Sequence, residues 1–152
     1  MLEIIPYSDE NKHYIKELNF EWLNKYFSVE PNDVVQLSNP KAEIIDKDGF
    51  IFYARFDNEI VGTAALMKID ETTVELCKMA VTESMQGKGI GRALMEHCLE
   101  TASKNKIRKL ILYSSTRLET AIAMYFRYGF VEVPFDSTHY KRANIKMELI
   151  IW

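Results

Sequence analysis

The chain has 152 residues, of which 47% are hydrophobic and 27% are charged. This is the composition of a folded globular protein, it excludes a disordered chain, and the length predicts one domain covering residues 1–152. With 19 Lys and Arg against 22 Asp and Glu, the net charge of −3 argues against a nucleic-acid partner held by a broad basic field.

The first third of the chain predicts a strand, a helix and then irregular structure. The apolar run Leu2 to Pro6 predicts the strand. From Asn11 onward, apolar residues at spacings of three and four predict a helix with one apolar face, formed by Ile15, Leu18, Trp22 and Tyr26. Residues 28–48 contain the breaker clusters Glu30-Pro31-Asn32-Asp33 and Ser38-Asn39-Pro40, which interrupt structure or start short helices.

Three consecutive apolar runs predict an antiparallel meander. The runs are GFIFYARF (49–56), IVGTAALM (60–67) and VELCKMAV (74–81), and their β-branched and aromatic residues favour strands. Short turns at residues 57–59 and 70–73 separate them. Strands joined by such short connections pair in an antiparallel manner.

The rest of the chain alternates helices and strands. A helix is predicted from the glycines near residue 90 to about Lys104, with an apolar stripe formed by Ile90, Leu94, Cys98 and Ala102. KLILYS (109–114) predicts a strand, and residues 120–128 predict a helix ended by Gly129. Strands follow at residues 130–133 and 145–151.

These elements predict a mixed α/β sheet that is antiparallel first and partly parallel later. The final strand, residues 145–151, is a candidate edge strand that could pair across a dimer, so the expected state is a monomer or a homodimer.

The N-terminal segment and the cysteines favour a cytoplasmic protein. The start MLEIIPYSDENK lacks the cationic and long apolar parts of a signal peptide, and no stretch reaches the roughly 18 apolar residues of a membrane span. Cys77 and Cys98 are too few for a disulfide framework, and their apolar flanks favour buried thiols. The three histidines show no metal-ligand spacing, so no metal is expected.

The most informative segment is Gln86-Gly87-Lys88-Gly89-Ile90-Gly91-Arg92, which joins the third meander strand to the following helix. Glycines let the backbone approach a ligand closely, and a helix N-terminus offers unpaired N–H groups with partial positive charge. Together with Lys88 and Arg92, these features predict an anion site suited to a pyrophosphate. The alternative is a glycine-rich turn without a ligand. The spacing matches neither a P-loop nor a dinucleotide fingerprint.

Two segments resemble the GNAT superfamily of N-acetyltransferases. Gln86-x-x-Gly89-x-Gly91 resembles its acyl-CoA-binding motif, Arg/Gln-x-x-Gly-x-Gly/Ala. AIAMYFRYGFVEV (121–133) resembles its helix, tyrosine and Gly-Phe ending before a strand. The resemblance covers about residues 49–152, whereas the first 48 residues carry no specific motif. It implies a GNAT-like fold, with a mixed and mostly antiparallel sheet of about six to seven strands and about four helices.

The resemblance also implies acetyl-CoA as the co-substrate. Backbone N–H groups from Gln86 to Gly91 would hold its pyrophosphate, and the main chain of residues 79–81 would pair with its pantetheine arm. The thioester would lie where strand 74–81 splays from strand 109–114. The cofactor-binding residues expected from this resemblance are Met79, Ala80, Val81, Gln86, Gly87, Lys88, Gly89, Ile90, Gly91 and Arg92.

Acetyl transfer to an amine requires removal of a proton from the ammonium, a donor for the thioester oxygen and a proton for the departing thiolate. Tyr125 matches the family tyrosine that faces the coenzyme A sulfur and is the candidate general acid, with a core tyrosine as the alternative. Glu75, the only carboxylate within strand 74–81, is the candidate base, with a solvent-facing strand residue as the alternative. A backbone N–H of this strand is the candidate donor.

The acceptor pocket has several polar candidates, namely Glu21, Tyr26, Glu30, His139 and Tyr140. The predicted reaction is direct attack by a small-molecule amine in a ternary complex. A peptide or protein amine is the alternative acceptor, and a non-catalytic acyl-CoA sensor is the alternative function. Cys77 is not expected to act as a nucleophile, because strand alternation should point Lys78 to the opposite face.

Overall fold

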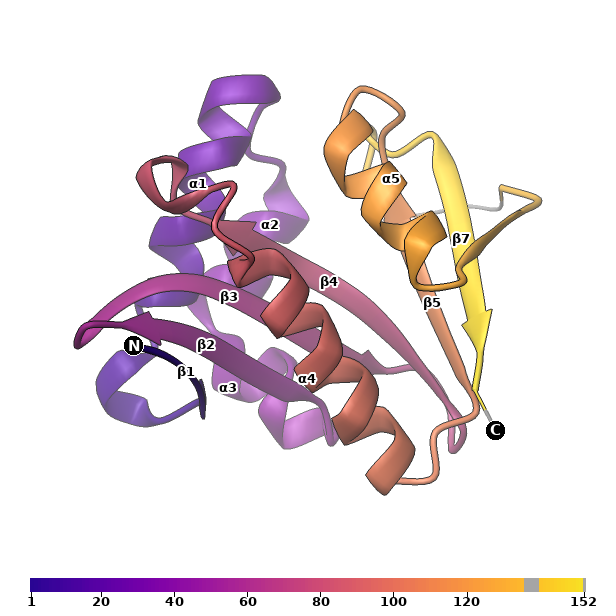
Figure 1. Ribbon diagram of the computed structural model, residues 1–152, viewed down its shortest axis with the longest axis horizontal. Coiled ribbons are helices and arrows are strands. Elements are labelled where there is room, and N and C mark those ends of the chain that lie inside the picture. The colour runs from indigo at the N-terminus through magenta and orange to yellow at the C-terminus, as the bar shows by residue number, and fades with distance from the viewer. Residues whose placement is uncertain (136–139, 152) are drawn as a thin grey trace.

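The structure is a computed structural model in which residues 1–135 and 140–151 are described. Its centre is a seven-stranded sheet in the order β1-β2-β3-β4-β5-β7-β6 (Figure 1). The strands are Leu2–Pro6 (β1), Phe50–Phe56 (β2), Glu59–Lys68 (β3), Thr73–Val81 (β4), Lys109–Ser114 (β5), Val131–Val133 (β6) and Ile145–Ile150 (β7). Every predicted strand is therefore confirmed, with boundaries that differ by one residue or so.

The strand directions confirm the predicted mixed sheet. β1 to β4 form an antiparallel meander, and β4 then pairs with β5 in parallel. The expectation that the final strand lies at an edge is wrong. β7 pairs on one side with β5 and on the other with β6, both antiparallel, and this leaves the three-residue strand β6 at the edge.

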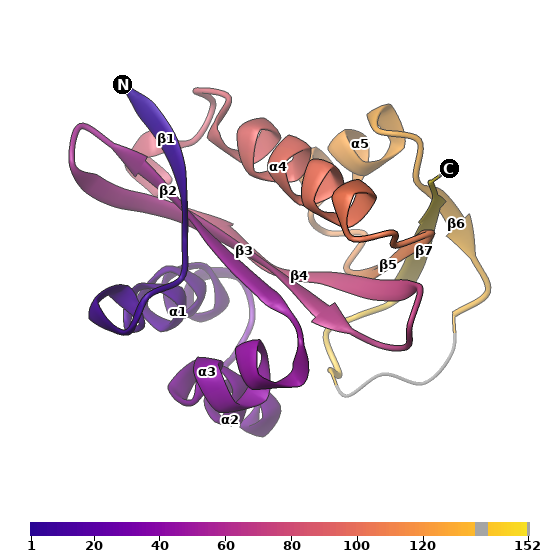
Figure 2. The ribbon, with the colours of Figure 1, turned by 90° about the horizontal axis from the view of Figure 1, so that it is seen from below.

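Helices cover both faces of the sheet (Figure 2). One face carries α1, α2 and α3, and the opposite face carries α4 and α5. None of the helices in the described residues is long and apolar enough to cross a membrane. The helices are Tyr14–Tyr26 (α1), Pro31–Ser38 (α2), Pro40–Glu43 (α3), Ile90–Lys104 (α4) and Glu119–Arg127 (α5), with short 3-10 helices Asp9–Asn11 (η1), Ile45–Lys47 (η2) and Glu83–Met85 (η3).

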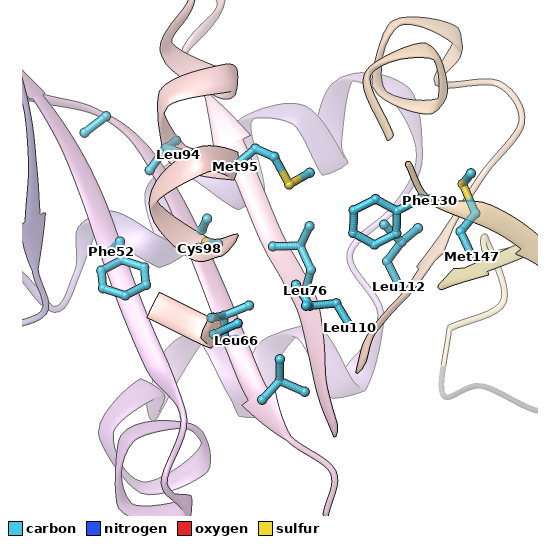
Figure 3. Packing of buried hydrophobic residues seen from close by; sticks show 14 of the residues in the cluster. Phe52, Leu66, Leu76, Leu94, Met95, Cys98, Leu110, Leu112, Phe130 and Met147 are labelled. Atoms are coloured by element: carbon cyan, nitrogen blue, oxygen red, sulfur yellow. The ribbon is translucent and has the colours of Figure 1, made fainter. Parts of the chain in front are cut away.

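The larger hydrophobic core lies between the sheet and the α4–α5 layer (Figure 3). All four residues of the predicted α4 stripe are buried in it, and each fully buried leucine contributes about 1.5–3 kcal/mol. Gly62 of β3 allows the close approach of α4, because a Cβ there would lie 3.2 Å from side-chain atoms of Ile90 and Leu94. This packing fixes the start of α4 against the sheet.

The second core lies beneath α1, α2 and α3 and includes Ile15, Leu37 and Tyr53. The predicted α1 helix is confirmed, but its buried face is rotated from the expected one. The buried residues of α1 are Ile15, Leu18, Asn19 and Leu23, whereas Tyr26 at its end is 44% exposed. Both prolines of the breaker clusters begin helices, because proline fits the first helical turn.

Candidate active site

The glycine segment forms an open cradle at the start of α4. Gly87 and Gly89 have φ of 78° and 81°, which is the left-handed region that favours glycine. A Cβ added at Gly87, Gly89 or Gly91 would meet no atom within 4 Å. The first bond of α4 runs from the Ala93 N–H to the Gly89 carbonyl (3.1 Å), so the N–H groups before it point out of the helix. These features suit the phosphate groups of a ligand.

β4 and β5 pair over only three residues of each strand, ending at Glu75 and Ile111. Beyond this point the strands separate (Figure 1). We call the separated stretches, Leu76–Val81 of β4 and Leu112–Ser114 of β5, the β4–β5 fork. Through η3, the β4 side of the fork leads to the glycine cradle, and the two strands splay where the sequence analysis expects it.

Backbone bonds show which groups of β4 face the fork. The Thr82 N–H donates to the Val61 carbonyl across the β3–β4 ladder (2.9 Å). Because strand residues alternate, Val81 turns its own N–H and carbonyl away from β3. The Gln86 side-chain amide donates to the Val81 carbonyl (3.1 Å), as this orientation requires. By the same alternation, the N–H and carbonyl of Ala80 point toward β3, and those of Met79 point toward the fork.

The two candidate catalytic residues come from opposite faces of the sheet. Tyr125 of α5 is half-buried against the larger core, with its ring 5.8 Å from that of Phe130 between centroids. Burial raises the pKa of the Tyr125 hydroxyl to about 12. Val74 and Leu76 belong to the same core, so the half-buried Glu75 between them points toward the α1–α3 face.

A buried group of charges lies on the α1–α3 face next to the fork. Arg142 donates two hydrogen bonds of 2.8 Å to Asp33, and the Lys78 ammonium lies 3.6 Å from the same carboxylate. The Asp33 side chain is 0% exposed and that of Lys78 is 5% exposed. Arg142 also contacts Glu30 (3.2 Å), and Lys78 donates to the Tyr140 hydroxyl (2.6 Å). We call Glu30, Asp33, Lys78, Tyr140 and Arg142 the Asp33 cluster.

Burial and charge act against each other in this cluster. Burial alone would raise the pKa of the Asp33 carboxyl, but hydrogen bonds from Arg142 and from the Glu30 N–H, with the nearby positive charges, hold it below its usual range. Burial lowers the pKa of Lys78, and the charge of Asp33 offsets part of this effect. Tyr140 has a raised pKa, mainly because it is buried. The cluster is therefore a tightly packed and nearly charge-balanced unit.

The predicted acceptor residues are not all in one place. Glu30 and Tyr140 belong to the Asp33 cluster, and Tyr140 donates a hydrogen bond to Gln36 of α2. Glu21 instead accepts hydrogen bonds from Thr82 and from the Glu83 N–H, and it lines an open hollow of about 360 Å³ beside η3. Tyr26 is exposed at the end of α1. The candidate His139 lies outside the described residues.

The expected orientation of Lys78 is wrong. Lys78 and Cys77 both lie on the α1–α3 face, because a left-handed φ of 55° at Lys78 interrupts the strand alternation. The conclusion about Cys77 is unaffected, since burial raises the pKa of its thiol despite the nearby lysine charge. Cys98 is buried, as predicted, and Cys77 is half-buried.

Sequence reasoning found the cradle but missed three charged members of the Asp33 cluster. The sequence marks Asp33 only as part of a helix-breaking cluster, and Lys78 only as a neighbour of Cys77. No local signal links either residue to Arg142, because Asp33 and Arg142 are 109 positions apart in the sequence.

Comparisons with known proteins agree with this geometry. The family model described as Acetyltransferase (GNAT) family matches residues 13–130. The uncharacterized N-acetyltransferase YvbK of Bacillus subtilis is 28% identical over 115 residues, covering 71% of this chain and 74% of that protein. The ribosomal protein bS18-alanine N-acetyltransferase of Escherichia coli K12 is 32% identical over 83 residues, covering 55% of each chain.

Solved structures have the same fold. A GNAT-family acetyltransferase from Staphylococcus aureus Mu50 gives a TM-score of 0.89 at 21% identity, covering 99% of both chains. The PaiA N-acetyltransferase of Thermoplasma acidophilum, solved in complex with coenzyme A, gives a TM-score of 0.78 at 19% identity and also covers 99% of both chains. The family model covers most of the chain and includes the glycine motif that forms the cradle. The chain therefore belongs to the GNAT family of acetyltransferases.

Proposed function

We propose that this protein transfers an acetyl group from acetyl-CoA to the amine of a small molecule, by direct attack in a ternary complex. The observation that carries the proposal is the position of the glycine cradle immediately after the β4–β5 fork. A cradle for phosphates at one end and exposed strand backbone along its approach match the two chemically distinct parts of coenzyme A, the pyrophosphate and the pantetheine arm.

The binding residues in this proposal are those of the cradle and of the end of β4. Backbone N–H groups from Gly87 to Gly91 bind the pyrophosphate, with the exposed Lys88 and Arg92 adding positive charge at the rim. The Gln86 N–H instead donates to the Glu83 carbonyl (3.2 Å), so Gln86 contributes through the bond of its side chain to the Val81 carbonyl. The main chain of Met79 to Val81 pairs with the pantetheine arm. Val81 offers its N–H and Met79 its carbonyl to the arm, and Ala80 holds this stretch to Thr63 of β3.

Three groups of the chain carry the chemistry. The Met79 N–H donates to the thioester oxygen, where negative charge develops during attack. Glu75 accepts the proton of the acceptor ammonium, directly or through a water. The Tyr125 hydroxyl, with its pKa raised to about 12, stays protonated near neutral pH and donates its proton to the departing thiolate.

The acceptor enters from the α1–α3 face in this proposal, because Glu75 points there. Glu21, Tyr26 and Glu30 are the proposed acceptor-side residues. The Glu21 carboxylate favours a cationic amine, whereas the Glu30 carboxylate is paired with Arg142 (3.2 Å). A second acceptor class, a protein N-terminus, is supported by the similarity to the ribosomal protein bS18-alanine N-acetyltransferase, to which this chain is 32% identical over 83 residues. A single domain, a cytoplasmic location, and a monomeric or homodimeric state stay predictions.

A thiol-release assay with acetyl-CoA tests the proposal. Putrescine, ethanolamine and glycinamide represent small amines, and short peptides with an N-terminal alanine or an internal lysine represent protein acceptors. Turnover with a small amine supports the proposal. Turnover with peptides alone would show that the acceptor is a peptide or protein amine and not a small molecule. Binding of acetyl-CoA without turnover across a broad amine panel supports the non-catalytic sensor instead.

A further inference from the structure

Lys78 lies at an irregularity in β4. Between the pairs Ala65–Cys77 and Thr63–Ala80, β4 has one residue more than β3. Lys78 sits in this extra stretch with φ of 55°, a left-handed conformation that is uncommon for residues other than glycine. The feature is a β-bulge, a device that redirects backbone and side-chain groups next to functional sites.

The bulge decides where the Met79 N–H points. In a regular strand, Met79 would lie opposite Thr63 and turn its N–H toward β3. With the extra residue, Ala80 takes that place instead. Met79 therefore turns its N–H toward the β4–β5 fork, as Val81 does. Only with the bulge can Met79 serve as the donor for the thioester oxygen.

Lys78 is held at both its main chain and its side chain. Its carbonyl accepts a hydrogen bond from the buried Asn19 amide of α1 (3.1 Å). Its ammonium donates to the Tyr140 hydroxyl (2.6 Å), lies 3.6 Å from Asp33 and lies 4.6 Å from the centroid of the Tyr140 ring. A lysine is rarely buried unless it is paired, so these contacts define the position of the whole side chain.

We propose that Lys78 is a positioning residue of the acetyltransferase: its contacts with Asp33 and Tyr140 hold the β4 bulge, and the bulge turns the Met79 N–H toward the thioester oxygen. This inference rests on the proposed function, because it assigns Met79 the role given there. Lys78 acts through the main chain and touches no reacting atom.

Calorimetric titration of the folded protein with acetyl-CoA and with coenzyme A tests the inference. Coenzyme A lacks the thioester oxygen, so only acetyl-CoA reports on the Met79 donor. Lys78→Met keeps most of the apolar stem and removes the charge. It should weaken acetyl-CoA binding by about three- to tenfold, the effect of one impaired hydrogen bond, and coenzyme A binding by less than about twofold.

A matched control is available in Lys106. This lysine also has a left-handed φ, 62°, but it is exposed in the turn after α4. Lys106→Met should change neither affinity. A purely structural role for Lys78 would instead lower both affinities equally, or lower the thermal midpoint alone, and either result overturns the proposal.

A milder variant covers the case in which Lys78→Met does not fold. Tyr140→Phe keeps the ring and removes the hydroxyl, which Lys78 and Gln36 share as a partner. It should weaken acetyl-CoA binding selectively, by less than Lys78→Met would. Acetyl-CoA labelled with carbon-13 at the thioester carbonyl gives a second readout. In both variants, the chemical shift of this carbon in the bound ligand should move toward its value in unbound acetyl-CoA. An unchanged resonance and affinity in a folded variant contradict the role of Lys78. Failure of the wild-type protein to bind either compound contradicts the proposed function itself.

Discussion

Glu75 of β4 and Ile111 of β5 form the last pair between these parallel strands. Beyond them, β4 leads into the glycine cradle and β5 leads toward α5, which carries Tyr125. The proposed base therefore stands where the short ladder ends, and the backbone donors of β4 and the phosphate-binding loop follow it along the chain. Tyr125, the proposed acid, lies on the other face of the sheet, where it packs against the larger core.

Replacing Tyr125 with phenylalanine should lower turnover by about a hundredfold, because the general acid is lost. The acetyl-CoA dissociation constant should stay nearly unchanged, since the hydroxyl contributes little to binding in the ground state. Steady-state kinetics with titration calorimetry measure both quantities. Tyr14→Phe, which removes a hydroxyl at the start of α1, is the control. Equal losses in turnover and affinity, or no loss in either, would count against an acid role.

Glu75→Gln should reduce turnover by about ten- to a hundredfold at neutral pH while leaving acetyl-CoA binding intact. The deficit should shrink as the pH rises toward about 10, because the acceptor amine then loses its proton in solution. A pH–rate profile measures this effect. The control Glu71→Gln changes an exposed carboxylate in the nearby turn. A deficit that is independent of pH would contradict the assignment of Glu75 as the base.

Asp33→Asn should lower the free energy of unfolding by about 3–5 kcal/mol at pH 7, because it leaves buried Arg142 and Lys78 without their shared carboxylate. Asp46→Asn, which breaks an exposed pair with Lys41, should cost no more than about 1 kcal/mol. Urea unfolding of both variants and the wild type measures these values.

The Asp33 effect should depend on pH in a defined direction. The pKa of this carboxyl is lower in the folded protein than its unfolded value of about 3.9, so its contribution is complete above about pH 4. The contribution is lost as the pH falls through the folded pKa, and the stability difference between wild type and Asp33→Asn should narrow there. A constant difference from pH 7 to pH 2 would contradict the ion-pair account.

Two substitutions at Gly91 separate folding from binding at the cradle. Gly91 lies in the first turn of α4, its φ is not left-handed, and an added Cβ would meet no atom within 4 Å. Gly91→Ala should therefore stabilise the fold by up to about 1 kcal/mol and leave acetyl-CoA binding intact.

Gly91→Glu should also fold well, since acidic side chains suit a helix N-terminus, but its carboxylate should repel the pyrophosphate. Calorimetry should show at least about tenfold weaker binding for Gly91→Glu. If Gly91→Glu binds acetyl-CoA with wild-type affinity, the cradle is not part of the binding site.

Elements with strong local patterns could be predicted from the sequence. The four-residue repeat Ile90, Leu94, Cys98 and Ala102 is buried as a stripe of α4. Turns at residues 57–58 and 69–72, close to the predicted 57–59 and 70–73, separate three paired strands. The glycine motif also lies where it was expected, because its strand-to-helix junction is set by adjacent residues.

Features that depend on distant partners could not be predicted. The apolar run of β7 is equally compatible with an edge and with its actual place between β5 and β6. The bulge at Lys78 gave no signal, because glycine or asparagine, not lysine, marks a left-handed position. The Asp33 cluster joins α2, β4 and the segment before β7, and only the folded chain brings these together.

Thermal unfolding of the wild-type protein with acetyl-CoA, coenzyme A, NAD and ATP tests the central claim most directly. A ligand at about 100 times its dissociation constant adds roughly 2.7 kcal/mol, which should raise the midpoint of a domain of this size by several degrees. The account predicts this rise with acetyl-CoA and coenzyme A, and no comparable rise with NAD or ATP. A folded sample whose midpoint moves with neither acetyl-CoA nor coenzyme A would contradict it.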